Sequence, residues 1–294
     1  MKKVNFMYFK PRFGFAIIFF LTSLVQAYAQ QASKVEKSYE IFDTKTAKNI
    51  SFPQMVERLK KYDVVFFGEE HNDSIAHLLQ LELYKALSTE NSSIVLAMEM
   101  FEKDIQLVLN EYLKSVISEK HFKKDARVWN NYSAYKPLIE FAKENNQTII
   151  ASNVPGRYAN LVNRKGINAL ETISTESKNW IPKMPLIMSD TAYENKFSAI
   201  MGGHDQEGIK NMFAAQTLWD TGMAESIATE LKKGAKQILH INGRFHSDGN
   251  MGIAFQLNQM MPKIKTVIIS SFSIKNEEEK NYRNLGDFVI VTRP

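Results

Sequence analysis

Two stretches of similar design decide the fold: VVFFGEEH at residues 64–71 and QILHINGRFH at residues 237–246. Each begins as a short apolar run and ends in Gly-x-x-His. Continuous apolar runs of this length are typical of strands buried on both faces, as in a parallel sheet. The glycine permits a sharp exit turn, so that the histidine can swing over the strand end. The two stretches therefore predict two buried strands that each end in a polar motif.

Four other apolar runs have the same character, and amphipathic helical patterns lie between them. The runs cover 94–98, 148–151, 266–269 and 288–291, and the helical patterns cover 75–88, 102–117, 134–145, 207–232 and 250–261. Repeated alternation of strand and helix predicts an α/β fold with a largely parallel central sheet covered by helices. We expect a partly helical insertion around residues 156–200 and a surface loop at 274–284.

The N-terminus has the layout of a secretory signal peptide. Four basic residues flank the start of an apolar run at 13–25, which Ala27-Tyr28-Ala29 follows as a small-residue cleavage site. The apolar run is too short to span a bilayer comfortably. We therefore expect residues 1–29 to be removed and residues 30–294 to form a single domain. The protein is then exported, and is periplasmic or peripherally associated with the outer membrane.

Composition excludes several classes of protein. The chain has 294 residues and no cysteine, so it has no disulfide, no thiolate metal site and no acylated cysteine of a lipoprotein. Its formal net charge of +5 falls to +1 without residues 1–29, because four basic side chains and no acidic ones are removed. The remaining basic residues are scattered in pairs, which argues against a nucleic-acid partner.

Polar side chains follow four of the predicted strands. If these strands are parallel, their carboxyl ends meet at one edge of the sheet, where open α/β sheets bind ligands. Imidazole and carboxylate groups are the ligands that zinc, iron or manganese accept where thiolates are absent, which makes His71, His246 and Glu99 candidate ligands of a divalent metal ion. The candidate pocket residues are Glu69, Glu70, His71, Glu99, Arg157, Arg244 and His246.

Each of these residues also has a structural alternative. His71 and His246 can cap helices or bond loop carbonyls, and Glu99 can form a buried salt bridge with an arginine. Glu69 and Glu70 compete for one role, and one of them can be a solvated charge at a helix N-terminus. Arg157 and Arg244 can bind a carboxylate or phosphate, or can pair with Glu69 or Glu99.

A second cluster is aromatic. WNNYSAYKP at 129–137 precedes a predicted helix, and MGGH at 201–204 precedes another. Tyrosine and histidine both ligate haem iron, so Tyr132, Tyr135 and His204 are candidate axial ligands. The alternative is a packed aromatic corner. The sequence contains no G-x-S-x-G, Walker A, H-E-x-x-H or G-x-G-x-x-G motif, so serine hydrolase, P-loop and Rossmann classes lack support.

Five groups of short motifs lie in order between about residues 55 and 275. They are Gly68-Glu69-Glu70-His71 with His77 and Gln80, Met98-Glu99-Met100-Phe101 with Gln106, Asn153-Val154-Pro155 with Arg157, Ala215-Gln216 with Trp219-Asp220 and Met223-Ala224, and Gly243-Arg244-Phe245-His246. The series resembles the ChaN-like haem-binding uptake family, part of the Tiki/TraB/erythromycin-esterase superfamily. The resemblance implies an α/β fold, export, and haem binding at a dimer interface in iron acquisition. It also implies a metal-dependent protease or hydrolase site in relatives that use both Gly-x-x-His units.

Three hypotheses follow. The first is an exported haem-binding protein of haem or iron uptake, with haem, a second copy of the chain and an outer-membrane haem transport machinery as partners. The second is a metal-dependent hydrolase or protease built on the two Gly-x-x-His motifs. The third is a non-catalytic periplasmic scaffold.

Overall fold

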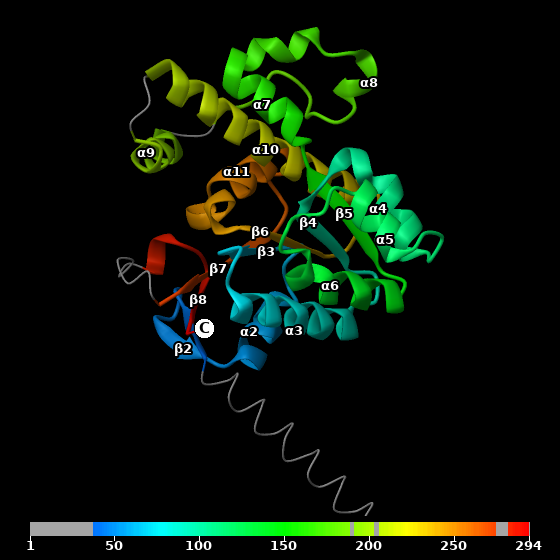
Figure 1. The fold of residues 1–294 in the computed structure, drawn as a ribbon. Coiled ribbons are helices and arrows are strands. Elements are labelled where there is room, and N and C mark those ends of the chain that lie inside the picture. The colour runs from blue at the N-terminus through cyan, green and yellow to red at the C-terminus, as the bar shows by residue number, and fades with distance from the viewer. Residues whose placement is uncertain (1–37, 189–190, 203–205, 275–281, 294) are drawn as a thin grey trace, which may run out of the picture. The chain divides into compact units, whose positions relative to one another are not determined.

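The computed structural model describes residues 38–188, 191–202, 206–274 and 282–293 (Figure 1). The chain divides into two compact units, Met1–Tyr39 and Glu40–Pro294, and the second unit carries the α/β fold. The expected signal peptide at 1–29 and its cleavage site lie outside the described residues. Within the described ranges, no helix is both long enough and apolar enough to cross a membrane.

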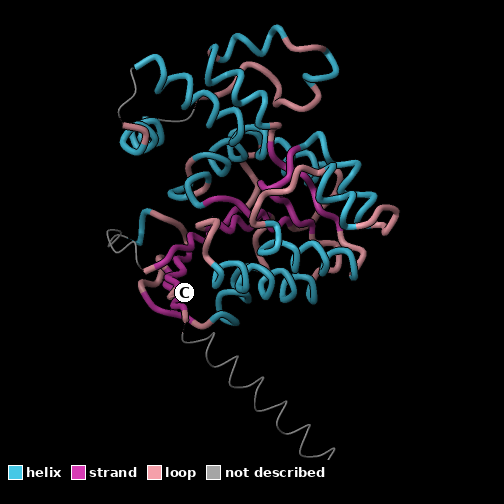
Figure 2. Tube along the Cα trace, in the orientation of Figure 1, coloured by secondary structure: helices cyan, strands magenta, loops and turns pink. Residues whose placement is uncertain are grey.

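An eight-stranded mixed sheet forms the centre of the second unit, in the order β2-β1-β8-β7-β3-β6-β4-β5 (Figure 2). The neighbours from β8 to β5 are parallel, and β1 pairs with β2 antiparallel. The strands are β1 (Tyr39–Asp43), β2 (Lys48–Ile50), β3 (Val64–Glu69), β4 (Val95–Glu102), β5 (Thr148–Asn153), β6 (Ile238–Gly243), β7 (Thr266–Ser273) and β8 (Phe288–Thr292). All six predicted strands are present, and the prediction of a largely parallel sheet is confirmed.

Helices lie on both sides of the sheet. In Figure 1, α10 and α11 lie on one side of it, and α2, α3 and α6 lie on the other. The α-helices are α2 (Phe52–Leu59), α3 (Ser74–Glu90), α4 (Gln106–Leu113), α5 (Glu119–Asp125), α6 (Tyr132–Glu144), α7 (Gly156–Lys165), α8 (Thr175–Lys178), α9 (Thr191–Ile200), α10 (Gln206–Lys232) and α11 (Gly252–Met260). Short 3-10 turns are η1 (Lys103–Ile105), η2 (Ile167–Thr172), η3 (Arg244–His246), η4 (Asp248–Asn250) and η5 (Tyr282–Asn284).

The packing of the core explains why the sequences of the central strands are unbroken apolar runs. Every residue of β3 and β6 is buried, because helices cover both faces of the sheet. One large cluster joins Phe66 and Ala97 of the sheet to Met223 of α10 and Leu257 of α11. Burial of this kind stabilises by about 25 cal/mol per Å² of apolar surface and holds the strand ends rigidly.

The hairpin β1–β2 was not predicted, because β2 is only three residues long and largely exposed, without an apolar run. Its turn is held by Asp43, whose carboxylate accepts hydrogen bonds from the backbone N–H groups of Lys45 and Thr46. The predicted insertion at 156–200 corresponds to α7, η2, α8 and α9. Of the expected loop at 274–284, residues 275–281 lie outside the described ranges.

Candidate functional site

The two Gly-x-x-His motifs lie side by side. Strands β3 and β6 are parallel neighbours, with Gly68 opposite Asn242 and Glu69 opposite Gly243. A Cβ atom on Gly68 would lie 2.8 Å from the Cα of Arg244, so only glycine permits the two strand ends to approach this closely. The prediction that both motifs emerge at one edge of the sheet is therefore confirmed.

Glu69 is a buried carboxylate surrounded by donors. Tyr135 Oη donates to it at 2.5 Å and Gln80 Nε2 at 2.5 Å, and His71 Nδ1 lies 2.9 Å from it. His77 Nε2 lies 3.2 Å from the second oxygen. Burial alone would raise the pKa of Glu69, but hydrogen bonds from His71, His77 and Tyr135 outweigh burial and lower it to about 2. Glu69 therefore stays ionised and orients His71.

His71 directs its other ring nitrogen toward the neighbouring strand. Because Nδ1 bonds Glu69, Nε2 is directed toward β6, where it would lie 2.8 Å from a Cβ on Gly243. The ring packs edge-on against Trp129, and Asn131 donates to the His71 carbonyl at 2.9 Å. The side chain is 42% exposed. Burial lowers the pKa of His71, but the bond to Glu69 and the charge of Glu99 raise it by more.

His246 has a similar arrangement. Its Nδ1 lies 2.6 Å from Asp220 Oδ1, and its Nε2 lies 3.5 Å from Glu99 Oε1. The other Glu99 oxygen accepts from the backbone N–H of Gly243 at 2.6 Å. Burial lowers the pKa of His246, but Glu99 and Asp220 outweigh it and raise the value to about 9. Burial also raises the pKa of Asp220, against the opposing effects of His246 and Tyr193.

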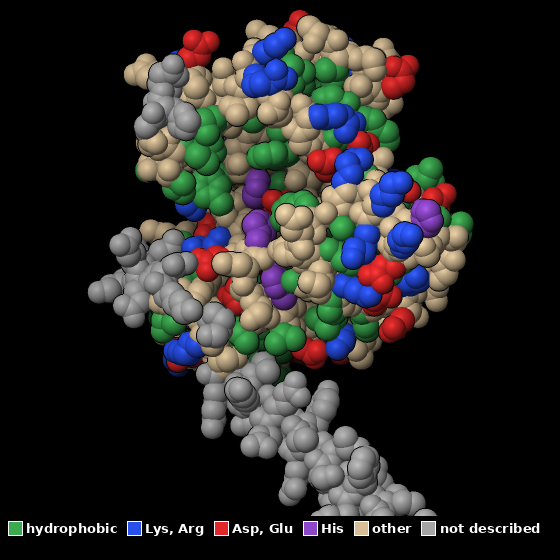
Figure 3. Space-filling view, viewed as in Figure 1, with side chains coloured by type: hydrophobic (Ala, Val, Ile, Leu, Met, Phe, Trp, Pro, Cys, Tyr) green, Lys and Arg blue, Asp and Glu red, His purple; other side chains and the backbone are tan. Residues whose placement is uncertain are grey.

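The site is thus two carboxylate-oriented imidazoles near one central carboxylate, Glu99. On the face drawn in Figure 3, histidine side chains follow a hollow between the upper and lower parts of the surface. Such an arrangement can hold a proton on either imidazole and can accept one from water or an acidic ligand.

Asp220, Tyr193 and Gln216 complete the site and were not assigned a role from the sequence. Tyr193 Oη donates to Asp220 Oδ2 at 2.9 Å, and Gln216 Nε2 lies 2.9 Å from His246 Nδ1. The sequence points to Gln216 and Asp220 only through the family resemblance. Both lie within α10, far from any strand end in the sequence, so strand-end reasoning had no means of finding them.

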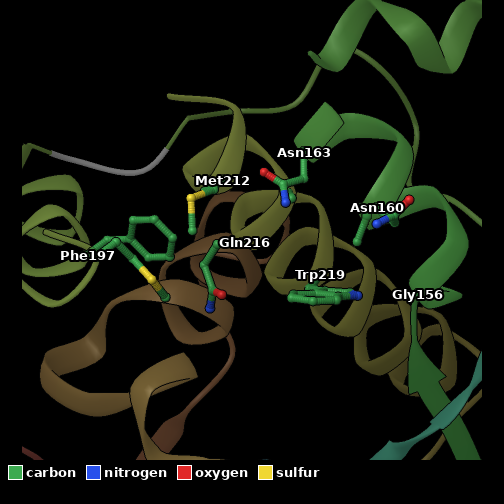
Figure 4. Close-up of a pocket in the computed structure, with 10 residues that line it drawn as sticks. Gly156, Asn160, Asn163, Phe197, Met212, Gln216 and Trp219 are labelled. Carbon is green, nitrogen blue, oxygen red and sulfur yellow. The ribbon is translucent and has the colours of Figure 1, made fainter. Parts of the chain in front are cut away.

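A cavity of about 400 Å³ is lined by residues of α7, α9 and α10 (Figure 4). Gln216 lines this cavity and also contacts the His246 ring, so it links the two. The walls come from α7, α9, the residue after α9, and α10. They are formed by Gly156, Ala159, Asn160, Asn163, Phe197, Met201, Met212, Ala215, Gln216 and Trp219. The cavity is mainly apolar and within the size range of small-molecule pockets.

Three predicted pocket residues lie elsewhere. Glu70 accepts a hydrogen bond from the backbone N–H of Ser273 at 3.1 Å, so Glu69 takes the role for which the two residues compete. Arg157 pairs with Asp104 at 2.7 Å, and Arg244 pairs with Asp248 at 2.8 Å. The alternative in which these arginines pair with Glu69 or Glu99 is therefore wrong, because nearer carboxylates hold both guanidinium groups.

The candidate iron ligands differ in placement. Tyr135 is 1% exposed and its hydroxyl donates to Glu69, and burial together with that charge raises its pKa. Tyr132 is 5% exposed, packs against Phe122, and has a pKa raised mainly by burial. Neither lines the cavity. His204 lies outside the described residues. The assignment of an axial ligand stays a prediction.

The predicted metal centre at His71, His246 and Glu99 receives no support. In the part of the chain that the structure describes, no group of three or more His, Cys, Asp or Glu side chains is arranged to hold a metal ion. The physical reason is that these groups already bind one another: each imidazole bonds a carboxylate, and Glu99 accepts from Gly243.

Comparison with known proteins gives the relationships of the chain. The family model described as "Haem-binding uptake, Tiki superfamily, ChaN" matches residues 55–257. The structure of ChaN of Campylobacter jejuni, described as binding haem cofacially, matches with a TM-score of 0.70 and 17% identity, covering 88% of this chain and 98% of that one. An erythromycin esterase mutant, EreC, matches with a TM-score of 0.47 and 10% identity, covering 87% of this chain and 83% of that one.

The curated relative is Protein RETICULATA-RELATED 5, chloroplastic, of Arabidopsis thaliana. It is 25% identical over 134 residues, which are 43% of this chain and only 18% of the length of the plant protein. The family model, by contrast, covers more than half of the chain and includes both Gly-x-x-His motifs. This chain therefore belongs to the ChaN family of haem-binding uptake proteins in the Tiki superfamily.

Proposed function

We propose that the protein binds haem in the cavity lined by α7, α9 and α10. The observation that carries this proposal is the family match over residues 55–257. The cavity supports it, because Trp219 and Phe197 supply flat apolar surface and Met201 and Met212 supply thioethers. Methionine is among the residues that ligate haem iron. The described lining residues carry no charge, so we expect the haem propionates to lie toward the solvent.

A hemin titration followed by visible absorbance tests this proposal. We expect a saturable Soret change with wild type. Met212→Leu conserves the size of the side chain and removes the sulfur, while Met184→Leu is the matched control on the exposed surface. Tyr132→Phe, Tyr135→Phe and His204→Ala test the sequence-based iron ligands in the same assay. Absence of any saturable Soret change in the wild type would contradict the proposal.

The proposal includes export and a role in haem or iron uptake. Its support is the basic and apolar N-terminus with Ala27-Tyr28-Ala29, and the uptake role of the family. Under this proposal the partners are a second copy of the chain and an outer-membrane haem transport machinery. N-terminal sequencing of protein from the periplasmic fraction should begin at Gln30. Light scattering with and without hemin should report a dimer in the haem-bound state, and a monomer under both conditions would contradict the pairing.

A second candidate function is hydrolysis by His71 without a metal ion. The observation that favours it is the Glu69-oriented imidazole with Nε2 directed toward Gly243 and an exposed edge. Neutral His71 would take a proton from a water molecule through Nε2 while the water oxygen attacks an acyl carbon, and His246 would protonate the leaving group.

Hydrolysis of p-nitrophenyl esters tests this candidate. Because the pKa of His71 is raised, its neutral form and hence the rate should increase with pH through that pKa. His71→Gln should abolish turnover, while His121→Gln on α5 should leave it unchanged. Equal rates for wild type and His71→Gln would exclude this activity.

A further inference from the structure

A buried polar chain runs beneath the site and uses a third histidine. His240 lies on β6 and is fully buried, with its ring edge-on to Phe66. Its Nδ1 lies 2.9 Å from Asn242 Oδ1 and its Nε2 lies 3.1 Å from Ser152 Oγ. Ser152 belongs to β5, two strands away in the sheet.

The strand between them makes this span possible. Ala97 of β4 is the register partner of both His240 on β6 and Ile150 on β5. These side chains therefore share one face of the sheet, as does Ser152, two residues beyond Ile150. Because Ala97 carries only a methyl group, the imidazole can reach across β4 to the serine hydroxyl.

The direction of each hydrogen bond follows from the far end of the chain. Asn242 contacts the carbonyl oxygen of Gly243 at 2.9 Å, and a carbonyl can only accept, so the group facing it is the amide NH₂. The same NH₂ donates to Ser247 Oγ at 3.0 Å. Asn242 Oδ1 must then accept from His240 Nδ1–H. In a neutral ring His240 Nε2 carries no proton, so it accepts from the Ser152 hydroxyl.

The chain ends on the loop of the second Gly-x-x-His motif, which packs closely against Gly68 of the first. Asn242 fixes the carbonyl of Gly243, whose N–H donates to Glu99 at 2.6 Å. Ser247 follows His246 directly, and its Oγ would lie 2.9 Å from a Cβ on Gly68. Gly243 thus links Asn242 to Glu99, and Ser247 lies where the two motifs approach each other.

We propose that His240 is a positioning residue: as the neutral Nδ1–H tautomer it relays a one-way hydrogen-bond chain from Ser152 through Asn242 to Gly243 and Ser247. This chain holds Glu99 and the loop of the second Gly-x-x-His motif in place. The proposal rests on the His71–His246 site being the working site of the protein. Burial lowers the pKa of His240 to about 4, which is consistent with a neutral ring at working pH.

Nitrogen NMR of ¹⁵N-histidine-labelled protein tests the tautomer. Between pH 6 and 8 the His240 ring should show a protonated Nδ1 and an unprotonated Nε2. The opposite tautomer, or a rapidly exchanging mixture, would overturn the assigned direction of the chain.

Amide hydrogen exchange tests the relay. His240→Leu removes both ring hydrogen bonds and should accelerate exchange at Gly243 and Ser247 by about tenfold or more, with Val289 of β8 unchanged as the internal reference. His240→Gln offers one donor and one acceptor and should restore protection to within about threefold of wild type. Equal exchange at Gly243 in the Leu and Gln variants would mean that His240 only fills space, and would refute the relay.

A milder pair of variants tests the relay if His240→Leu does not fold. Ser152→Ala removes the donor at the start of the chain, whereas Ser271→Ala removes a buried hydroxyl that has no hydrogen-bond partner among the described residues. The first should increase exchange at Gly243 and the second should not, and equal effects would refute the relay. Hemin titration of wild type and of these variants separates the relay from the proposed haem binding. Failure of wild type to bind hemin would contradict only the proposed function.

Discussion

Replacement of Glu69 by glutamine should cost more stability than any other single change of a carboxylate to an amide at this sheet edge. The carboxylate is almost fully buried and receives hydrogen bonds from Tyr135 and Gln80 and contacts from two histidines. Its pKa is about 2 in the folded protein, against an ordinary value of 4.5. At 1.36 kcal/mol for each pKa unit, ionisation of Glu69 contributes about 3 kcal/mol at neutral pH.

The stabilisation by ionised Glu69 depends on pH in a defined direction. Because the folded pKa lies below the unfolded value, the stabilisation is complete above about pH 4.5 and is lost as pH falls through the folded pKa of about 2. By pH 3 roughly 2 kcal/mol of it should already be gone. Glu69→Gln should therefore be about 3 kcal/mol less stable than wild type at pH 7 and markedly closer to it at pH 3.

Urea unfolding of both proteins at pH 7 and pH 3, followed by circular dichroism, measures the difference. Glu70→Gln is the matched control, because the neighbouring carboxylate accepts from the backbone of Ser273 and should change stability by less than about 1 kcal/mol. A Glu69→Gln cost that equals the Glu70→Gln cost, or that stays constant between the two pH values, would refute this account of the site.

Two further predictions concern the neighbouring groups. The pKa of His246 is about 9 in the folded protein, against an ordinary value of 6.5. Protonated His246 therefore stabilises the fold fully below about pH 6.5, and this stabilisation is lost as pH rises through 9. The free energy of unfolding should fall by about 3 kcal/mol over that range, and Asp220→Asn should make the decline smaller. A pH-independent wild type between 6.5 and 9.5 would contradict this. Gly68→Ala should destabilise by about 1–3 kcal/mol in the same assay, because the new Cβ meets the backbone of Arg244. Gly202→Ala should be nearly neutral, because the new Cβ meets no atom of the described residues within 4 Å.

The hydrogen-bond pattern explains why the metal prediction received no support although four of the predicted side chains lie close together. Composition and strand-end position correctly brought His71, His246, Glu69 and Glu99 together. What a sequence pattern does not reveal is how donors and acceptors are already paired. Glu69 is surrounded by donors, so its oxygens are not free for a cation, and the arrangement favours proton holding and ligand positioning.

The sequence predicted the order of the main strands and helices, the parallel sheet and the edge at which the site forms. It did so because an apolar run between turn residues has few ways to bury both faces, and because parallel strands necessarily end on the same side. Tertiary structure alone decided which side chains reach that edge from elsewhere. Asp220 on α10, Tyr135 on α6 and Ser152 on β5 are brought to the histidines by packing across 26, 64 and 88 residues of chain. Local periodicity carries no record of contacts over such separations, so hydrogen-bond partners, and with them every pKa shift at the site, were decided only by the folded structure.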